Sequence, residues 1–226
     1  MARPILVYGH PASGKSFAFK SLNPDTTIIL DVDCKGALPW RGFKKNYSPE
    51  KKNFFSIDTL DKIYNSIKKI ANDDAYKNIT VIGVDGFNNA LVNEQTFYDD
   101  WHNPKNPYEK YAELAKKTKR IIKLAQNMRD DLTVIFTAHV ECADSFAPGE
   151  VDHLLTPGKQ LRDKMRIEGS FLYVFYAKID NEGNHFFETI PVNSTARAPE
   201  DCFPPTIPND FKLILDTINA YENGDD

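Results

Sequence analysis

The sequence predicts an α/β protein with a mainly parallel sheet, flanking helices and antiparallel strands at one edge. Continuous apolar runs alternate with segments of helical periodicity, as expected when parallel strands are covered on both faces. A glycine-rich motif follows the first apolar run directly. Late in the chain, two β-rich segments flank Asn-Glu-Gly-Asn at 181–184, a pattern typical of a hairpin. A chain of 226 residues can bury one substantial core.

Composition excludes several classes of protein. The chain is 41% hydrophobic and has a net charge of -4, which argues against general disorder and against a uniformly basic DNA-coating protein. No apolar run approaches the roughly 20 residues that span a bilayer, and we expect neither a signal peptide nor a membrane partner. Three widely spaced cysteines without a CxxC pattern predict neither disulfides nor a zinc site, and favour a cytoplasmic location.

The first half of the chain contains three predicted strands and two predicted helices. A helix over Lys15–Leu22 is expected to end at Asn23-Pro24, and a second begins near Asp58 with an apolar face. The stretch Trp40–Lys52 is interpreted as a basic loop. The predicted strands are Pro4–Tyr8, Thr26–Val32 and Phe54–Ile57.

The second half repeats the alternation. A strand over Ile79–Val84 ends at Asp85, a helix begins near Phe87 and is interrupted around Asn103-Pro104, and the longest helical pattern covers Tyr108–Arg129. Further strands are expected at Leu132–Ala138, Leu172–Ile179 and His185–Val192, and a closing helix at Phe211–Tyr221. We therefore predict a core over residues 1–199 and a C-terminal helix with an acidic tail over 200–226.

The glycine-rich motif predicts a phosphate-binding loop. It fits GxxxxGK[ST] in full, follows a predicted strand and opens a predicted helix, whose positive end would favour phosphate. Lys15 would reach the β and γ phosphates of a nucleotide, and the Ser16 hydroxyl would ligate Mg²⁺. The expected nucleotide-binding residues are Gly9, His10, Pro11, Ala12, Ser13, Gly14, Lys15 and Ser16.

Polar residues at the ends of other strands supply the remaining candidates. Asp85 is the carboxylate expected to hold the metal with Ser16. Asp31 and Asp33 close the second strand at alternate positions, so we expect them on one face, with Asp33 orienting the attacking water. His139 ends the fourth strong strand and is interpreted either as a sensor of the γ-phosphate or as a structural histidine.

In this order of motifs the chain resembles the RecA-like P-loop ATPase core, especially phage-encoded single-strand annealing and recombination ATPases of the AAA domain family. The resemblance rests on the P-loop, on Asp31-Val32-Asp33, on Asp85-Gly86 and on Thr137-Ala138-His139, and it continues through Gly158-Lys159-Gln160-Leu161-Arg162. It implies an Mg²⁺-dependent ATPase that acts in DNA recombination or replication. It also implies a homo-oligomer, single-stranded DNA as a partner, a single-stranded DNA-binding protein as a further partner, and the host cytoplasm.

The same resemblance assigns roles to individual residues. Asp33 takes the place of a catalytic glutamate, and His139 that of a polar sensor that is commonly glutamine. Aspartate is shorter than glutamate by one methylene, and this departure argues against rapid hydrolysis. Arg197 is a candidate finger toward a neighbouring subunit. The loop over 141–159 corresponds to a DNA-contacting loop, with contact expected at Lys159, Gln160, Arg162 and Lys164.

Two further basic stretches are candidates for a phosphate-backbone groove, although most such charge runs are simply solvated. One is the helix bearing Lys116, Lys117, Lys119, Arg120 and Lys123. The other is Arg41–Lys52, where Trp40, Phe43 and Tyr47 are potential base-stacking partners.

Two functions from other classes stay open beside the DNA-linked ATPase. They are a metabolic P-loop kinase and a nucleotide-gated interaction module with little turnover.

Overall fold

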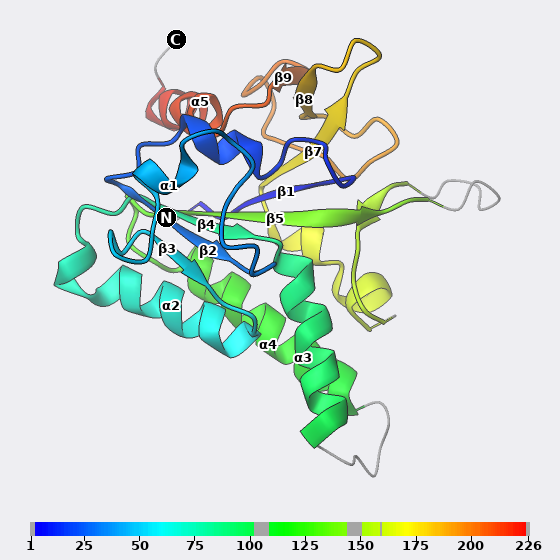
Figure 1. Cartoon of the computed structure of the whole chain (residues 1–226). Helices are drawn as coiled ribbons and strands as arrows, with labels where there is room; N and C mark the ends of the chain where they lie inside the picture. The colour runs from blue at the N-terminus through cyan, green and yellow to red at the C-terminus, as the bar shows by residue number, and fades with distance from the viewer. Residues whose placement is uncertain (1–2, 102–108, 144–150, 159, 225–226) are drawn as a thin grey trace.

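A mostly parallel sheet organises the chain (Figure 1). The computed structural model describes residues 3–101, 109–143, 151–158 and 160–224. Within these residues one sheet has the strand order β3-β2-β4-β5-β1-β7-β8-β9, and β6 pairs with β5 off this path. Parallel pairing joins the neighbouring strands β3, β2, β4, β5, β1 and β7. The pairs β7-β8, β8-β9 and β5-β6 are antiparallel. The predicted fold class is therefore confirmed.

The bounds of the elements follow the predicted alternation closely. The strands are β1 Ile5–Gly9, β2 Thr27–Asp31, β3 Phe54–Ser56, β4 Val81–Asp85, β5 Thr133–Glu141, β6 His153–Leu154, β7 Tyr173–Ile179, β8 His185–Glu188 and β9 Thr206–Pro208. The helices are α1 Phe43–Asn46, α2 Leu60–Asn72, α3 Phe87–Trp101, α4 Glu109–Gln126 and α5 Phe211–Asn223. Short helical turns are η1 Phe17–Ser21, η2 Asp74–Tyr76, η3 Gln160–Met165 and η4 Ile167–Ser170.

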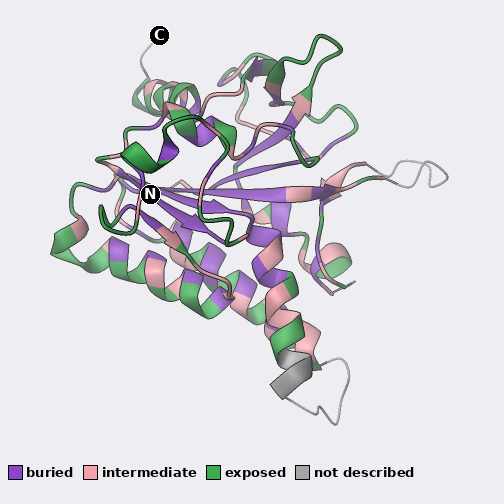
Figure 2. Ribbon diagram, viewed as in Figure 1, coloured by how far each residue is buried: buried purple, intermediate pink, exposed green. Residues whose placement is uncertain are grey.

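Alternating side chains of the central strands divide the core into two layers. In β1, Leu6 and Tyr8 join the cluster beneath α2, α3 and α4, whereas Ile5 and Val7 face η1, α1 and α5. All four are fully buried, because a parallel strand inside such a sheet is covered on both faces. Figure 2 shows the central strands buried along most of their length, with exposed residues on the outer faces of the helices.

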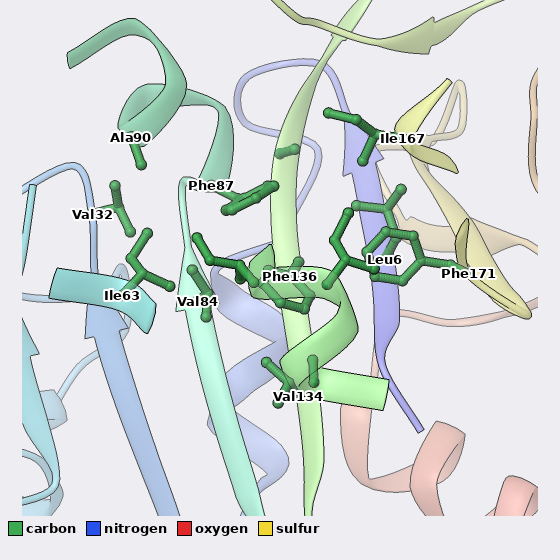
Figure 3. Packing of buried hydrophobic residues seen from close by; sticks show 14 of the residues in the cluster. Leu6, Val32, Ile63, Val84, Phe87, Ala90, Val134, Phe136, Ile167 and Phe171 are labelled. Carbon is green, nitrogen blue, oxygen red and sulfur yellow. The ribbon is translucent and has the colours of Figure 1, made fainter. Parts of the chain in front are cut away.

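The larger core layer lies between the sheet and helices α2, α3 and α4. Phe136 of β5 makes an edge contact with Phe87 at a ring-centroid distance of 5.0 Å, and with Phe171 at 5.7 Å. Figure 3 shows these rings together with Leu6 of β1 and Ile63 of α2. This layer fixes the strand ends from which the candidate site residues project.

The helix over Lys15–Leu22 is the main difference from the predicted elements. Only a 3-10 turn forms, η1, after a left-handed Gly14 with φ +92°. The segment has only eight residues, too few to sustain an α-helix by local propensity, and Asn23-Pro24 prevents its extension. The P-loop is therefore not followed by the α-helix whose dipole was expected to favour phosphate.

Among the strands and α-helices, three small elements were not predicted. The basic loop contains the single helical turn α1, and the segments after β5 and β8 contribute β6 and β9. Strands of two or three residues carry too few side chains for an alternation pattern. The β9 strand nevertheless matters, because it pairs with β8 and leads into α5 near the P-loop.

Candidate nucleotide-binding site

A pocket of about 600 Å³ opens at the carboxyl ends of β1, β4 and β5 and beside the turn after β2. This is where parallel α/β sheets place their ligands, and the volume suits a small molecule. Its lining residues are Pro11, Ala12, Ser13, Gly14, Lys15, Ser16, Phe17, Asp33, Lys35, Ala37, Leu38, Pro39, Asp85, Gly86, Thr137, Ala138, His139 and His185. The structure thus brings most of the P-loop together with Asp33, Asp85 and His139.

The P-loop backbone requires glycine at two positions. Gly9 lies against β7, where an added Cβ would be 2.4 Å from the carbonyl oxygen of Ala177. At Gly14 the φ of +92° and the nearby Asn209 amide, 2.6 Å from an added Cβ, both disfavour any side chain. These constraints hold the loop close to the carboxyl end of β1 and its neighbouring strand β7.

Lys15 is folded back over its own loop. Its ammonium donates hydrogen bonds to the carbonyl oxygens of Gly9 at 2.8 Å and His10 at 2.6 Å, and it lies 3.3 Å from the Ser13 hydroxyl. Burial lowers the pKa of Lys15 to about 8, and the nearby Asp85 carboxylate partly opposes this shift. A buried ammonium held mainly by neutral oxygens is well suited to exchange them for phosphate oxygens.

Ser16 and Asp85, the two expected metal ligands, contact each other directly. The Ser16 hydroxyl is 2.8 and 2.9 Å from the two carboxylate oxygens of Asp85. Thr137 donates to Asp85 Oδ1 at 2.6 Å and accepts from the backbone N–H of Gly86 at 3.0 Å. Asp85 is 1% exposed, and burial raises its pKa although these hydroxyl contacts oppose the shift.

Asp33 reaches the pocket from the turn that follows β2. Its carboxylate accepts a hydrogen bond from the Asn89 side-chain amide of α3 and pairs with the Lys35 ammonium. Gly86 leaves room for it, since an added Cβ there would be 2.3 Å from Asp33 Oδ1. The side chain of Asp33 is only 8% exposed, so this carboxylate is held in one place.

The expectation that Asp31 and Asp33 share one face of a strand is wrong. Strand β2 ends at Asp31, and the chain then turns, with Cys34 in the left-handed region at φ 54°. Asp31 is fully buried, and its carboxylate accepts from the Gly36 backbone N–H at 2.8 Å. Asp31 therefore holds the turn, and Asp33 alone lines the pocket.

His139 ends the pocket-lining part of β5. Its backbone N–H donates to the Asn88 side chain of α3 at 2.9 Å, which fixes the strand end against that helix. Its Nδ1 is buried and has no hydrogen-bond partner in the described part of the chain. Burial, and secondarily the charge of Lys15, lower the pKa of the imidazole. The ring therefore offers a neutral polar group beside the pocket.

Arg197 is turned toward its own chain. Its guanidinium donates to the backbone carbonyl oxygens of Phe171, at 3.0 Å, and of Glu168, while its backbone bridges to Val174. A role as a finger toward another subunit would require both side-chain bonds to break.

The segment expected to contact DNA is only partly described. Lys159 lies outside the described residues, and Gln160, Arg162 and Lys164 belong to the turn η3. Arg162 is committed to two carboxylates, at 3.4 Å from Glu141 and 2.8 Å from Asp163. This pairing leaves Lys164 as the exposed cation among the three described residues.

The expectation of base stacking by Phe43 and Tyr47 is wrong, because both rings are buried. They are 3% and 2% exposed and stack on each other at 5.4 Å. Phe54 of β3 packs against Phe43, and half-buried Trp40 covers the cluster. The aromatic residues of this basic stretch therefore anchor α1 to the core.

Residues that the sequence reasoning missed complete the pocket. Thr137 lies two residues before His139, so strand alternation alone could have placed both on one face. His185 lines the pocket from β8, and the Asn209 amide is 3.5 Å from the Ser13 carbonyl oxygen. No local signal points to those two, because they reach the P-loop through the pairing of β7, β8 and β9.

The side chains fit Mg²⁺ with a nucleotide. A hydroxyl and a carboxylate supply the hard oxygen ligands that Mg²⁺ prefers, while substrate phosphates commonly complete its shell. Ser16 and Asp85 provide this pair, and the buried carboxylate of Asp85 faces no cation within salt-bridge distance in the described part of the chain. The unpartnered Nδ1 of His139 adds a polar atom that a ligand could satisfy.

Comparisons with known proteins leave the family open. No protein-family model matches the chain, and no curated protein matches it. Among solved structures, the flagellar accessory protein FlaH from Methanocaldococcus jannaschii is similar over 91% of this chain and 83% of its own, with 15% identity and a TM-score of 0.42. Within the described residues, no helix is both long and apolar enough to span a membrane.

Proposed function

We propose that this protein binds ATP with Mg²⁺ at the pocket and hydrolyses it, and that its nucleotide state is coupled to single-stranded DNA in recombination or replication. The observation that carries the nucleotide part is the convergence of Lys15, Ser16, Asp33, Asp85 and His139 around one pocket. These residues come from four separate strand ends, so a shared structural role does not account for their meeting. Nucleotide hydrolysis at a P-loop needs a lysine, a hydroxyl and a carboxylate for the metal, and a group that positions water, all at one place.

Binding begins with the P-loop. The Lys15 ammonium exchanges the carbonyl oxygens of Gly9 and His10 for phosphate oxygens, while the backbone amides of the loop face the same anion. Ser16 and Asp85 would hold Mg²⁺, which supplies positive charge to the phosphates. Thr137 keeps Asp85 in one orientation through its 2.6 Å hydrogen bond.

Hydrolysis requires a group that positions water. Asp33 is the pocket carboxylate that does not contact Ser16, and Asn89 and Lys35 fix its position. It would accept a hydrogen bond from the attacking water and take its proton. His139 would contact the γ-phosphate side of the nucleotide with a neutral ring.

The coupling proposal rests on the resemblance and on the continuation of β5 beyond the pocket. The carbonyl oxygen of His139 accepts from the Leu155 backbone N–H at 2.8 Å, so β5 and the segment around β6 are joined at the pocket edge. Glu141 then contacts both His153 and Arg162. A displacement of His139 would therefore be transmitted to η3, which packs against α4.

The direct test is ATP hydrolysis by the wild type, Lys15→Ala and Asp33→Ala, each with and without single-stranded DNA. We expect Mg²⁺-dependent turnover in the wild type, stimulated by DNA. Lys15→Ala should bind ATP about 10- to 150-fold more weakly. Asp33→Ala should bind ATP but turn over about 100-fold more slowly or worse. The matched control Asp25→Ala, at an exposed aspartate before β2, should behave as the wild type. Unchanged turnover in Lys15→Ala would refute the site, and indifference to DNA would refute the coupling.

One observation favours a second function, a nucleotide-gated interaction module with little turnover. Asp33 is paired with Lys35 and bonded to Asn89, so its carboxylate is already engaged by two donors and would have to share an oxygen or release a donor to bind the attacking water. Tight ATP binding with turnover no faster than that of Lys15→Ala would favour the module. A metabolic kinase has less support, because no arginine is among the described residues that line the pocket.

A further inference from the structure

Helices α2 and α4 carry most of the positive charge on one side of the sheet. Their net charges are +2 and +4, although the whole chain is at -4. Both lie on the same face of the sheet, away from α1 and α5 (Figure 1), and they contribute to one core layer. The charge is therefore concentrated on two neighbouring helices.

Two contacts between the helices fix their relative placement. Lys117 of α4 pairs with Asp61 of α2 at 2.7 Å, and the Arg120 guanidinium lies 3.8 Å from the ring centroid of Tyr64. The second contact lies three residues after the first on both helices, so α2 and α4 run in the same direction. Lys68, one turn beyond Tyr64, is consequently level with the part of α4 that carries Lys123.

Several of these cations have no acidic partner. Lys116 and Lys117 are paired with carboxylates, but the exposed ammonium groups of Lys68, Lys119 and Lys123 have none among the described residues. Lys119 and Lys123 are four residues apart and therefore neighbours on α4. We define Lys68, Lys119, Arg120 and Lys123 as the α2–α4 basic face.

The surroundings of this face indicate the kind of partner. None of the large apolar side chains of α2 or α4, both fully described, is among the exposed ones. Protein interfaces are built around apolar and aromatic anchors, whereas a phosphate backbone requires only cations. In η3, by contrast, Arg162 is already neutralised by Glu141 and Asp163.

We propose that the α2–α4 basic face is the surface that binds the phosphate backbone of single-stranded DNA. This inference rests on the proposed function and moves the contact away from the segment over 159–164. Lysines without fixed partners suit phosphates that are read as point charges and not as a sequence. The half-buried Tyr64 ring lies under Arg120, one of the cations of the face.

The test measures binding of labelled oligothymidine by fluorescence anisotropy over a series of salt concentrations. The variant is Lys68→Gln/Lys119→Gln/Lys123→Gln. The matched control, Arg41→Gln/Lys44→Gln/Lys45→Gln, removes the same charge from exposed residues at α1 on the other face of the sheet. For the variant we expect the slope of log K against log salt to fall by about 2, at ~0.7 per lost phosphate contact. The affinity at low salt should fall about tenfold or more, and the control should change little.

Further measurements separate this inference from the proposed ATPase. The triple variant should keep the wild-type melting curve and the DNA-independent rate of ATP hydrolysis, since its residues lie outside the pocket. Lys15→Ala should lose hydrolysis and still bind DNA. The assignment would be overturned if the variant and the control lost equal DNA affinity. It would also be overturned if the wild type bound poly-glutamate as tightly as DNA, or did not bind DNA. The hydrolysis data would stand in every case.

Discussion

Two ionisable side chains inside the pocket are buried in ways that disfavour their charged forms. Burial raises the pKa of Asp85 and lowers the pKa of Lys15 to about 8. Such groups cost stability in the free protein, and they are typical of sites that bind charged ligands. Both effects can be measured.

Asp85→Asn should stabilise the free protein and abolish Mg²⁺-dependent nucleotide binding. An acid whose pKa is raised on folding stabilises the fold below its unfolded pKa, and this contribution disappears as pH rises through the folded pKa. Burial of the carboxylate is therefore a cost to the fold at neutral pH, and we expect its removal to raise the melting temperature by about 2–4 °C.

The melting curves should be compared between pH 7 and pH 4, where the advantage of Asp85→Asn is expected to shrink. Asp74→Asn, at an exposed aspartate paired with Lys77, is the matched control and should be neutral. A destabilised Asp85→Asn protein at pH 7 would show that this carboxylate contributes to the fold through its hydroxyl contacts.

ATP affinity should fall as pH rises through about 8. Only the ammonium form of Lys15 attracts phosphate, and its pKa of about 8 in the free protein places its loss of charge in this range. We expect affinity to be constant near pH 7 and to fall by up to tenfold per pH unit above 8. Titrations of Lys15→Ala over the same range should be flat, and a flat wild-type profile would contradict the assignment.

At the residue scale the sequence predicted many of the residues that meet at the pocket, but not all of them. The P-loop lysine, Ser16 and Asp85 were predictable because a fixed spacing and a strand end determine them. Asn89 and His185 were not, because their contacts with Asp33 and Gly14 depend on how α3 and β8 pack. Long-range packing of this kind leaves no local pattern in a sequence.

Among the elements, α5 packs on the sheet as an integral part of the core. Phe211 is fully buried, with its ring 4.7 Å from that of Phe19 in η1 and 5.7 Å from that of Phe187 in β8. Asp210 caps the helix by accepting from the Leu213 backbone N–H at 2.9 Å. The helix therefore supports η1, the turn that follows the P-loop.

Phe211→Ala should reduce the free energy of unfolding by about 3–5 kcal/mol, because it leaves a cavity between η1 and β8. Leu213→Ala, at a residue of the same helix that is 38% exposed, should cost far less. Urea unfolding of both variants is the measurement. Equal costs would contradict the packing of α5, while a loss of ATP affinity in Phe211→Ala alone would connect this helix with the P-loop.

Apolar periodicity predicted the long elements well and the short ones poorly. Helix α2 was expected from Leu60, Ile63, Ile67 and Ile70, and all four are buried. The segment after Lys15 was expected to be α-helical and forms only η1, since its packing against α5 and β4 overrides weak local propensity. Phe19, for example, occupies the space that a side chain at Gly83 would need.

On the scale of the whole molecule, the strand order explains why the site forms. Strand β5 lies between the P-loop strand β1 and the Asp85 strand β4, so Thr137 and His139 project between the two motifs. Strands and helices that alternate could be predicted from the sequence. The order of the strands in the sheet could not, because tertiary packing determines it. The order is also what places the α2–α4 basic face on one side of the sheet and α1 on the other.

Calorimetric titration with ATP and Mg²⁺ tests the central claim most directly. The account predicts saturable binding at one site per chain, weakened about 10- to 150-fold in Lys15→Ala through loss of a charge-assisted bond to phosphate. Lys44→Ala, at an exposed lysine of α1, should bind as the wild type does. Equal affinities for the wild type and Lys15→Ala, or no binding by the wild type, would contradict the assignment of this pocket to a nucleotide.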